Sequence, residues 1–317
     1  MMISQKERDF SLDLYRCLLM LGICLLHSIS QAGHNVSWAA NMLSWCVPGF
    51  MFISGWFGIR FSLAKVIKLF GISLYCAVVF VAFDAHFSDL SGGSYFVRVY
   101  AIAKGQWFLN AYVIVMCFAP MVNLAIDRMT VKELYPLVLV AFGWSFATTL
   151  PIWRYVPSSP GLTAYSFLTL LGVYVVARFA RRAYDEGGHF YELMENKKVL
   201  LMIVGMCLIM AAIGLGDYNS PFAITIAGGM LFVVKDCGVA SWLGRVCVWL
   251  GPSMFSVYLM HSHGQGWGYL QWLQDSLLAW DVPLVVAYLL TALGVFAVCV
   301  AADLPRRIVV MLLKRVK

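Results

Sequence analysis

Apolar residues run along this chain in segments of about 20, and short polar or charged stretches separate them. A run of roughly 20 mostly apolar residues is long enough to cross a bilayer as a helix. The pattern therefore predicts an all-α, polytopic membrane protein with about ten transmembrane helices. These helices are expected at 10–30, 41–59, 64–83, 106–126, 134–150, 162–179, 198–214, 219–235, 246–262 and 283–303.

Three segments differ from a simple apolar span. The ninth predicted helix contains Gly251-Pro252, which interrupts a helix, and it continues into a polar, glycine-rich stretch. Segment 95–105 is short and is expected to be a re-entrant or interfacial helix. The first apolar run follows basic residues, as in a signal peptide, but it carries Asp13 and Arg16 and no small-residue cleavage site. We therefore expect it to be retained as the first span.

Composition agrees with a membrane protein. The chain is 62% hydrophobic and 12% charged, whereas soluble domains average about 45–50% and about 25%. We therefore expect residues 1–317 to form a single transmembrane domain. The nine cysteines are scattered, with neither a CxxC pair nor a metal-ligand spacing, so they are interpreted as structural.

Lys and Arg are distributed unevenly between the predicted loops. If the N-terminus is cytoplasmic, 19 of the 23 Lys and Arg residues fall on the cytoplasmic side, and only Arg98, Lys104 and Arg154 fall outside. Cytoplasmic loops of membrane proteins carry such an excess. The bias predicts an even number of spans with both termini cytoplasmic. The net charge of +7 is thus explained by topology, and no nucleic-acid partner is expected.

Arg16 and His27 lie eleven residues apart in the first predicted helix. Eleven steps of about 100° place both side chains on one face, roughly 16 Å apart along the axis. Ionisable side chains inside a span are costly and usually functional. Two other interpretations remain open: Arg16 could be an interfacial arginine paired with Asp13, and His27 could be an interfacial polar residue.

Four short motifs follow one another along the chain. They are Asp13-x-x-Arg16 with ten residues before His27; Pro48 to Trp56 with Ser54-Gly55; Gln106-Trp107-Phe108-Leu109 with Pro120 following; and Phe255-Ser256-x-Tyr258-x-x-His261. In this order and on about ten spans, they resemble the family 3 membrane acyltransferases. The resemblance covers nearly the whole chain.

The resemblance implies a cytoplasmic acyl-CoA donor and O-acylation of a sugar on the outer side of the membrane. His27 is then expected to be the catalytic base, because imidazole accepts a proton near neutral pH. Arg16 is expected to orient the donor or bind its phosphates. One extended pantetheine arm could touch both residues. Direct transfer and a transient acyl-imidazole both remain possible.

Further candidates for the acyl-CoA site lie near the second span. Lys65 and Lys68 stand where the family often carries Arg-x-x-Arg, but lysine lacks the bidentate geometry of arginine. Both could instead be positive-inside anchors. Ser54, next to Gly55, could line the acyl pocket or allow close helix packing.

Candidates for the acceptor side are Trp107, Arg154, Tyr258 and His261, all near the outer ends of predicted spans. Trp107 could equally be an interfacial aromatic residue, and Tyr258 and His261 could be structural. His261 and His263 have no carboxylate or cysteine partner nearby in the sequence, so no metal site is expected.

The resemblance and the residues together predict an acyl-CoA-dependent O-acyltransferase of the cell envelope. It would transfer an acetyl group from acetyl-CoA to a cell-surface polysaccharide or a lipid-linked sugar in a bacterial inner (plasma) membrane. Acetyl-CoA would be a co-substrate, with no tightly bound cofactor, and membrane lipid would surround the chain. Two alternatives remain: a polysaccharide exporter, although intramembrane carboxylates for ion coupling are scarce, and a non-catalytic assembly scaffold.

Overall fold

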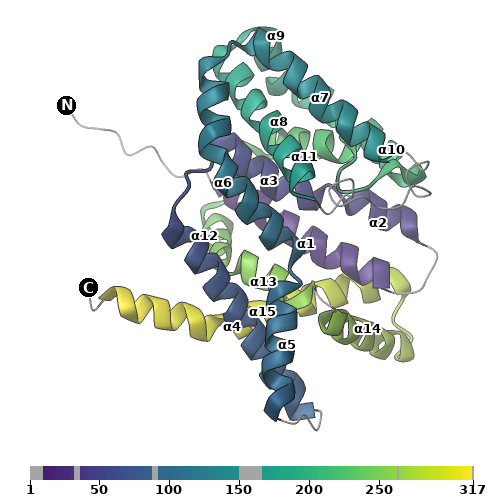
Figure 1. Cartoon of the computed structure of the whole chain (residues 1–317). Coiled ribbons are helices and arrows are strands. Elements are labelled where there is room, and N and C mark those ends of the chain that lie inside the picture. The colour runs from purple at the N-terminus through teal and green to yellow at the C-terminus, as the bar shows by residue number, and fades with distance from the viewer. Residues whose placement is uncertain (1–9, 32–35, 88–91, 150–165, 263, 316–317) are drawn as a thin grey trace.

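The fold is entirely helical in the residues that the computed structural model describes, which are 10–31, 36–87, 92–149, 166–262 and 264–315. The all-α prediction is therefore confirmed. Figure 1 shows α1 in the middle of the molecule, between two groups of helices.

The helices have the following bounds: α1 Phe10–Gln31, α2 Ser37–Leu43, α3 Cys46–Phe57, α4 Leu63–Phe87, α5 Gly92–Lys104, α6 Trp107–Arg128, α7 Val131–Thr149, α8 Phe167–Glu186, α9 Gly188–Glu195, α10 Lys197–Met210, α11 Pro221–Val234, α12 Ser241–Leu250, α13 Met254–His261, α14 Gly264–Ala279 and α15 Leu284–Arg315. A π-helical turn, Ala211–Leu215, extends α10, and a 3₁₀ turn, Gly251–Ser253, joins α12 to α13.

Six of the described helical segments are long and apolar enough to cross a membrane. They are Phe10–Ser30, Leu63–Ala82, Trp107–Arg128, Lys197–Leu215, Ser241–His261 and Leu284–Leu313. Helix α11 is apolar but shorter. These segments agree with a multi-pass membrane protein, while the count of ten spans stays a prediction.

Two predicted spans are divided, and two helices, α9 and α14, were not predicted. Segment 41–59 is split between α2 and α3, and segment 246–262 is split by the 3₁₀ turn at Gly251-Pro252. Proline lacks an N–H and clashes with the preceding turn, which explains the second division. Helix α14 lies in the polar, glycine-rich stretch that follows the ninth predicted span. The helix α5 confirms that the segment 95–105 is helical.

Helix α1 belongs to two hydrophobic cores. Tyr15, Leu19 and Ile23 pack into a core formed with α3, α6, α8 and α11. Cys17 and Met20 pack into a second core formed with α4, α12, α13 and α15. Positions 15 and 17 differ by about 200° around a helix, so position 16 lies between these two faces. The packing of α1 therefore directs Arg16 toward the seam between the cores.

Close packing of α3 against α8 depends on a glycine. A Cβ atom added at Gly55 would lie 2.6 Å from Ala177 Cβ and 2.8 Å from the Tyr174 carbonyl oxygen. Small residues allow membrane helices to approach in this way. The helix then ends at Gly58, whose φ of 75° is readily adopted only by glycine. The chain leaves α3 toward α4 at this point.

Candidate active site

Three of the chain's cations line one cavity at the start of α4. This cavity has a volume of about 310 Å³, and its polar lining consists of Arg16, Ser54, Arg60, Lys65 and Tyr112. Helices α1, α3, α4 and α6 contribute to it together with the segment between α3 and α4. Positive charge with hydroxyl donors is suited to an anionic ligand such as a phosphate.

Arg16 combines two of the roles considered from the sequence. Its Nη1 lies 3.2 Å from Asp13 Oδ1, and Asp13 is 5% exposed while Arg16 is 39% exposed. The predicted i,i+3 pair is therefore present. A guanidinium carries five N–H donors, so pairing with one carboxylate oxygen leaves donors for the cavity that Arg16 also lines. The ion pair orients Arg16 and leaves part of its guanidinium available to a ligand.

A second cavity, of about 200 Å³, continues from the first along α1. Arg16 and Phe50 line both cavities. The second cavity is also lined by Met20 and Ile23, which lie one and two turns beyond Arg16, and by Tyr258. Positions 16, 20, 23 and 27 share one helical face. The cavity therefore follows the face of α1 that leads from Arg16 toward His27.

His27 meets a second imidazole at the far end of this face. The ring centroids of His27 and His261 lie 5.0 Å apart, and Trp267 packs edge-on against His27 at 6.2 Å. The Nδ1 atom of His27 is buried and forms no hydrogen bond with the described residues. A buried polar atom without a partner is costly, and such atoms are common at functional sites.

His261 has a defined orientation in this pair. Its Nδ1 lies 2.6 Å from the carbonyl oxygen of Val257. A carbonyl can only accept, so Nδ1 carries the hydrogen, and in a neutral ring the lone pair belongs to Nε2. The residue is buried at 2% exposure. His261, considered from the sequence as an acceptor-side residue, thus has the geometry of an oriented imidazole beside His27.

A third cavity, of about 280 Å³, lies on the other side of His261. Apolar residues of α4, α13, α14 and α15 form its walls, including Phe80, Val295 and Leu273. Two of its lining residues, Trp272 and Val298, are 66% and 68% exposed on the outside of the molecule. Because α15 is one of the long apolar helices, this exposed edge would face lipid.

The remaining predicted site residues are distributed as follows. Lys68 lies one turn beyond Lys65 on α4 and does not line the cationic cavity. Trp107 begins α6 and stacks on Tyr218 with centroids 6.3 Å apart. Tyr258 shares a cavity with Arg16 rather than the one beside His261. Arg154 lies outside the described residues.

Two residues of the cationic cavity were not singled out from the sequence. Arg60 was counted among the positive-inside anchors, yet it lines the cavity with Arg16 and Lys65. Tyr112 lies with its hydroxyl 3.3 Å from Ser54 Oγ, which also donates to the carbonyl oxygen of Phe50 at 3.0 Å. In the sequence, Gly58 could have indicated a turn beside Arg60, because it lies five residues before the next helix and adopts a positive φ.

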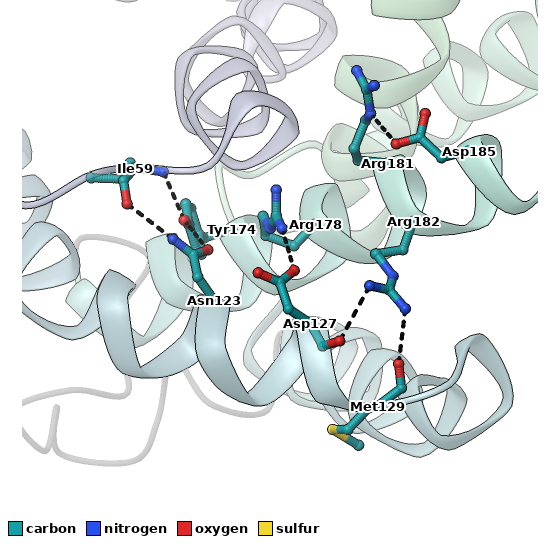
Figure 2. Close-up of polar contacts among 9 residues, drawn as sticks. All are labelled: Ile59, Asn123, Asp127, Met129, Tyr174, Arg178, Arg181, Arg182 and Asp185. Carbon is teal, nitrogen blue, oxygen red and sulfur yellow. Dashed lines mark hydrogen bonds and ion pairs between the residues drawn. The ribbon is translucent and has the colours of Figure 1, made fainter.

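The segment that carries Arg60 is held by side chains from two other helices. Figure 2 shows Asn123 of α6 and Tyr174 of α8 side by side, both bonded to the backbone of Ile59. The Ile59 N–H donates to the Tyr174 hydroxyl at 2.9 Å, and Asn123 Nδ2 donates to the Ile59 carbonyl at 3.0 Å. Nearby, Arg178 pairs with Asp127 at 2.8 Å, and Arg182 donates to backbone carbonyls.

The fold and the cavities define a membrane protein with a cationic cavity at one end of α1 and a pair of imidazoles at the other. A family model described as an acyltransferase domain matches residues 9–304, which is nearly the whole chain. The chain belongs to this family, the family 3 acyltransferases, and it is a membrane acyltransferase. Comparisons with curated proteins and with solved structures gave no match.

Proposed function

We propose that this membrane acyltransferase takes an acetyl group from cytoplasmic acetyl-CoA and transfers it to a carbohydrate hydroxyl on the outer side of the membrane. The observation that carries the proposal is the pair of adjoining cavities along α1, with Arg16 in both and His27 beyond Ile23 on the same face. A donor with a charged end and a long thin arm fits this shape. Residues 1–317 would form one catalytic domain in a bacterial inner membrane.

The donor would bind with its phosphates in the cationic cavity. Arg16, Arg60 and Lys65 supply the charge there, and arginine can bind phosphate through two parallel hydrogen bonds. The arm would then pass Phe50 and follow Met20 and Ile23. The distance of roughly 16 Å from Arg16 to His27 is of the order of an extended pantetheine arm. Lys68 would contribute only to the surrounding positive charge.

The chemistry requires one base and a leaving thiolate. His27 or His261 takes the proton from the acceptor hydroxyl while its oxygen attacks the thioester carbonyl carbon. The C–S bond breaks, the new C–O ester bond forms, and the thiolate of coenzyme A leaves and takes up a proton. If His27 is acylated first, the same bonds are broken and formed in two steps.

The apolar cavity beside His261 favours a lipid-linked acceptor within the carbohydrate class. Its lining is apolar apart from His261 and the Tyr269 side chain, and it is open beside Val298. A cavity open toward the bilayer core is filled by hydrocarbon rather than water. A lipid chain held there would place its sugar head group near the two imidazoles. Trp107, stacked on Tyr218, is a further surface for a sugar ring.

The exporter alternative has less support from the charges of the bundle. Among the side chains that the structure describes, two buried carboxylates occur in the long apolar helices, Asp13 at 5% and Asp303 at 0% exposure. Each lies beside an arginine three residues later, at 3.2 Å for Arg16 and 2.6 Å for Arg306. Carboxylates that are already paired with arginine are poorly suited to binding a coupling proton or sodium ion.

The proposal is tested by release of coenzyme A from acetyl-CoA. The purified protein would be placed in nanodiscs with or without a total membrane lipid extract. Free coenzyme A would be measured by mass spectrometry, since the nine cysteines would react with thiol reagents. We expect release by the wild type and its loss in His27→Ala. The control is His189→Ala, because His189 is fully exposed on α9. Equal release by wild type and His27→Ala would contradict the proposal.

A further inference from the structure

The segment between α3 and α4 is held in place through the backbone of Ile59. Both polar groups of this one peptide unit are bonded to side chains: its N–H to the Tyr174 hydroxyl at 2.9 Å, and its carbonyl to Asn123 Nδ2 at 3.0 Å. The Tyr174 hydroxyl donates in turn to Asn123 Oδ1 at 2.7 Å. The three bonds form a closed arrangement between α6, α8 and the segment (Figure 2).

This arrangement is built into the interior of the fold. Tyr174 is 0% exposed and packs in the core shared by α1, α3 and α8. The preceding residue, Gly58, has a φ of 75°, and a Cβ there would lie 3.0 Å from Arg178 Nη1. The segment therefore has a fixed conformation at residues 58 and 59. A peptide unit bonded by buried side chains loses those bonds at a cost if either partner is removed.

The next residue after the held peptide is Arg60, which lines the cationic cavity with Arg16 and Lys65. Lys65 Nζ donates to the carbonyl oxygen of Arg60 at 3.3 Å. Neither Arg60 nor Lys65 forms an ion pair with a described residue, in contrast to Arg178 and Arg181, which pair with Asp127 and Asp185. Positive side chains left without a carboxylate at a cavity are available to an anionic ligand.

We infer that Tyr174 and Asn123 are positioning residues for the donor site: they hold Ile59 so that Arg60 meets the phosphates of the acyl-CoA. This inference rests on the proposed function, and it adds Arg60 to the phosphate-binding set. Tyr174 and Asn123 line neither cavity along α1. They act on the donor only through the backbone that carries Arg60.

The test is the affinity of the full-length protein in nanodiscs for two probes, coenzyme A and S-acetyl-pantetheine, which lacks the phosphates of coenzyme A. We expect Tyr174→Phe to weaken coenzyme A binding about tenfold, the equivalent of one or two lost hydrogen bonds to a charged or buried group. S-acetyl-pantetheine binding should be unchanged. The matched control is Tyr75→Phe, because the Tyr75 hydroxyl is likewise bonded to a backbone group of another segment: it donates to the carbonyl oxygen of Ala302 at 2.8 Å, away from the cavity.

A double-mutant cycle separates positioning from a general structural effect. In an Arg60→Ala background, Tyr174→Phe should cause no further loss of coenzyme A affinity, because the residue that it positions is already absent. Additive losses, or equal losses for both probes, would overturn the inference. Asn123→Ala should give the same pattern as Tyr174→Phe, and it serves as the second variant if Tyr174→Phe does not fold.

The outcome also distinguishes this inference from the proposed function. If the wild type binds coenzyme A and Tyr174→Phe binds it equally well, the positioning role is wrong while the acyl-CoA proposal stands. If the wild type binds neither coenzyme A nor S-acetyl-pantetheine, the donor proposal fails, and the positioning role fails with it. Turnover at saturating donor should change little in Tyr174→Phe, since the imidazoles lie far along α1.

Discussion

The imidazole rings of His27 and His261 lie 5.0 Å apart, although 234 residues separate them in the sequence. Helices α1 and α13 each bring one ring to this point. His261 is fixed by its bond to Val257, whereas the Nδ1 of His27 has no hydrogen bond among the described residues. Two imidazoles in contact can have different roles, with one ring accepting a proton and the other orienting the first ring or the substrate.

Replacing either imidazole should lower turnover and leave donor binding intact. We expect His27→Ala and His261→Ala each to reduce the rate of coenzyme A release by at least about 100-fold, the usual lower value for loss of a general base. Coenzyme A affinity should be unchanged, because the phosphates would bind roughly 16 Å away. Rates and affinities would be measured on the same preparations. A variant that loses affinity and rate in parallel would instead indicate a damaged fold.

Blocking the apolar cavity should reduce transfer to a lipid-linked acceptor. Val298→Trp would place a large ring at the exposed edge of this cavity, whereas Val285→Trp would make the same change at an equally exposed position (68%) of α15 outside it. We expect about a tenfold loss of acyl transfer to the lipid fraction in the first variant only. The measurement is incorporation of radiolabelled acetyl groups into extracted lipid. Equal incorporation by both variants would exclude a lipid chain at this cavity.

The glycine contact between α3 and α8 should contribute to stability. In Gly55→Ala the added methyl group would lie within 2.8 Å of both Ala177 and Tyr174. Overpacking of this kind costs about 1–3 kcal/mol, so the thermal midpoint in detergent should fall. Gly205→Ala on α10 is the control, since nothing lies within 4 Å of its added Cβ, and alanine has the higher helix propensity. A thermal midpoint equally low in both variants would show that the α3–α8 contact makes no special contribution to stability.

The start of α7 should show a small acid dependence. The Thr130 N–H and hydroxyl donate to Glu133 at 2.7 and 2.8 Å, and the Thr130 hydroxyl accepts the Glu133 N–H, which forms a capping box. The bond from the Thr130 N–H, followed by that from its hydroxyl, lowers the pKa of the exposed Glu133 carboxyl. A lowered folded-state pKa stabilises the protein above the ordinary value of about 4.3, and this stabilisation is lost as the pH falls through the lowered value.

Glu133→Gln provides the measurement for this effect. The variant should be less stable than the wild type at pH 6, and this difference should disappear as the pH falls below the lowered pKa of the Glu133 carboxyl. Amide exchange at the first turn of α7 reports the difference locally. A difference in stability that stays the same at both pH values would mean that the charge of Glu133 has no part in the cap.

Much of this arrangement followed from local sequence, and the rest depended on contacts between distant residues. The helical nature of the chain follows from its long apolar runs, and the common face of Arg16 and His27 follows from helical periodicity. The pairing of Arg16 with Asp13 is also a local, i,i+3 relation. These features need no knowledge of tertiary packing.

Tertiary contacts decided the features that the sequence did not indicate. The proximity of His27 to His261 depends on α13 packing beside α1, and no local pattern encodes it. In the sequence, Arg60 does not differ from other basic residues at a membrane boundary. Only the structure shows that Tyr174 and Asn123 bind the backbone beside it. Likewise, the helix α14 lies in a glycine-rich stretch where propensity alone favours a loop.

The position of α1 in two cores has a consequence for donor length. Tyr15 and Ile23 fix this helix to one core while Cys17 and Cys24 fix it to the other, along the stretch that separates Arg16 from His27. A helix packed on both sides cannot shorten or slide to bring its ends closer together. The distance along α1 between Arg16 and His27 is therefore constant. Small acyl donors without a long arm, such as acetyl phosphate, would bind their charge at one end and leave their carbonyl carbon out of reach of the imidazoles.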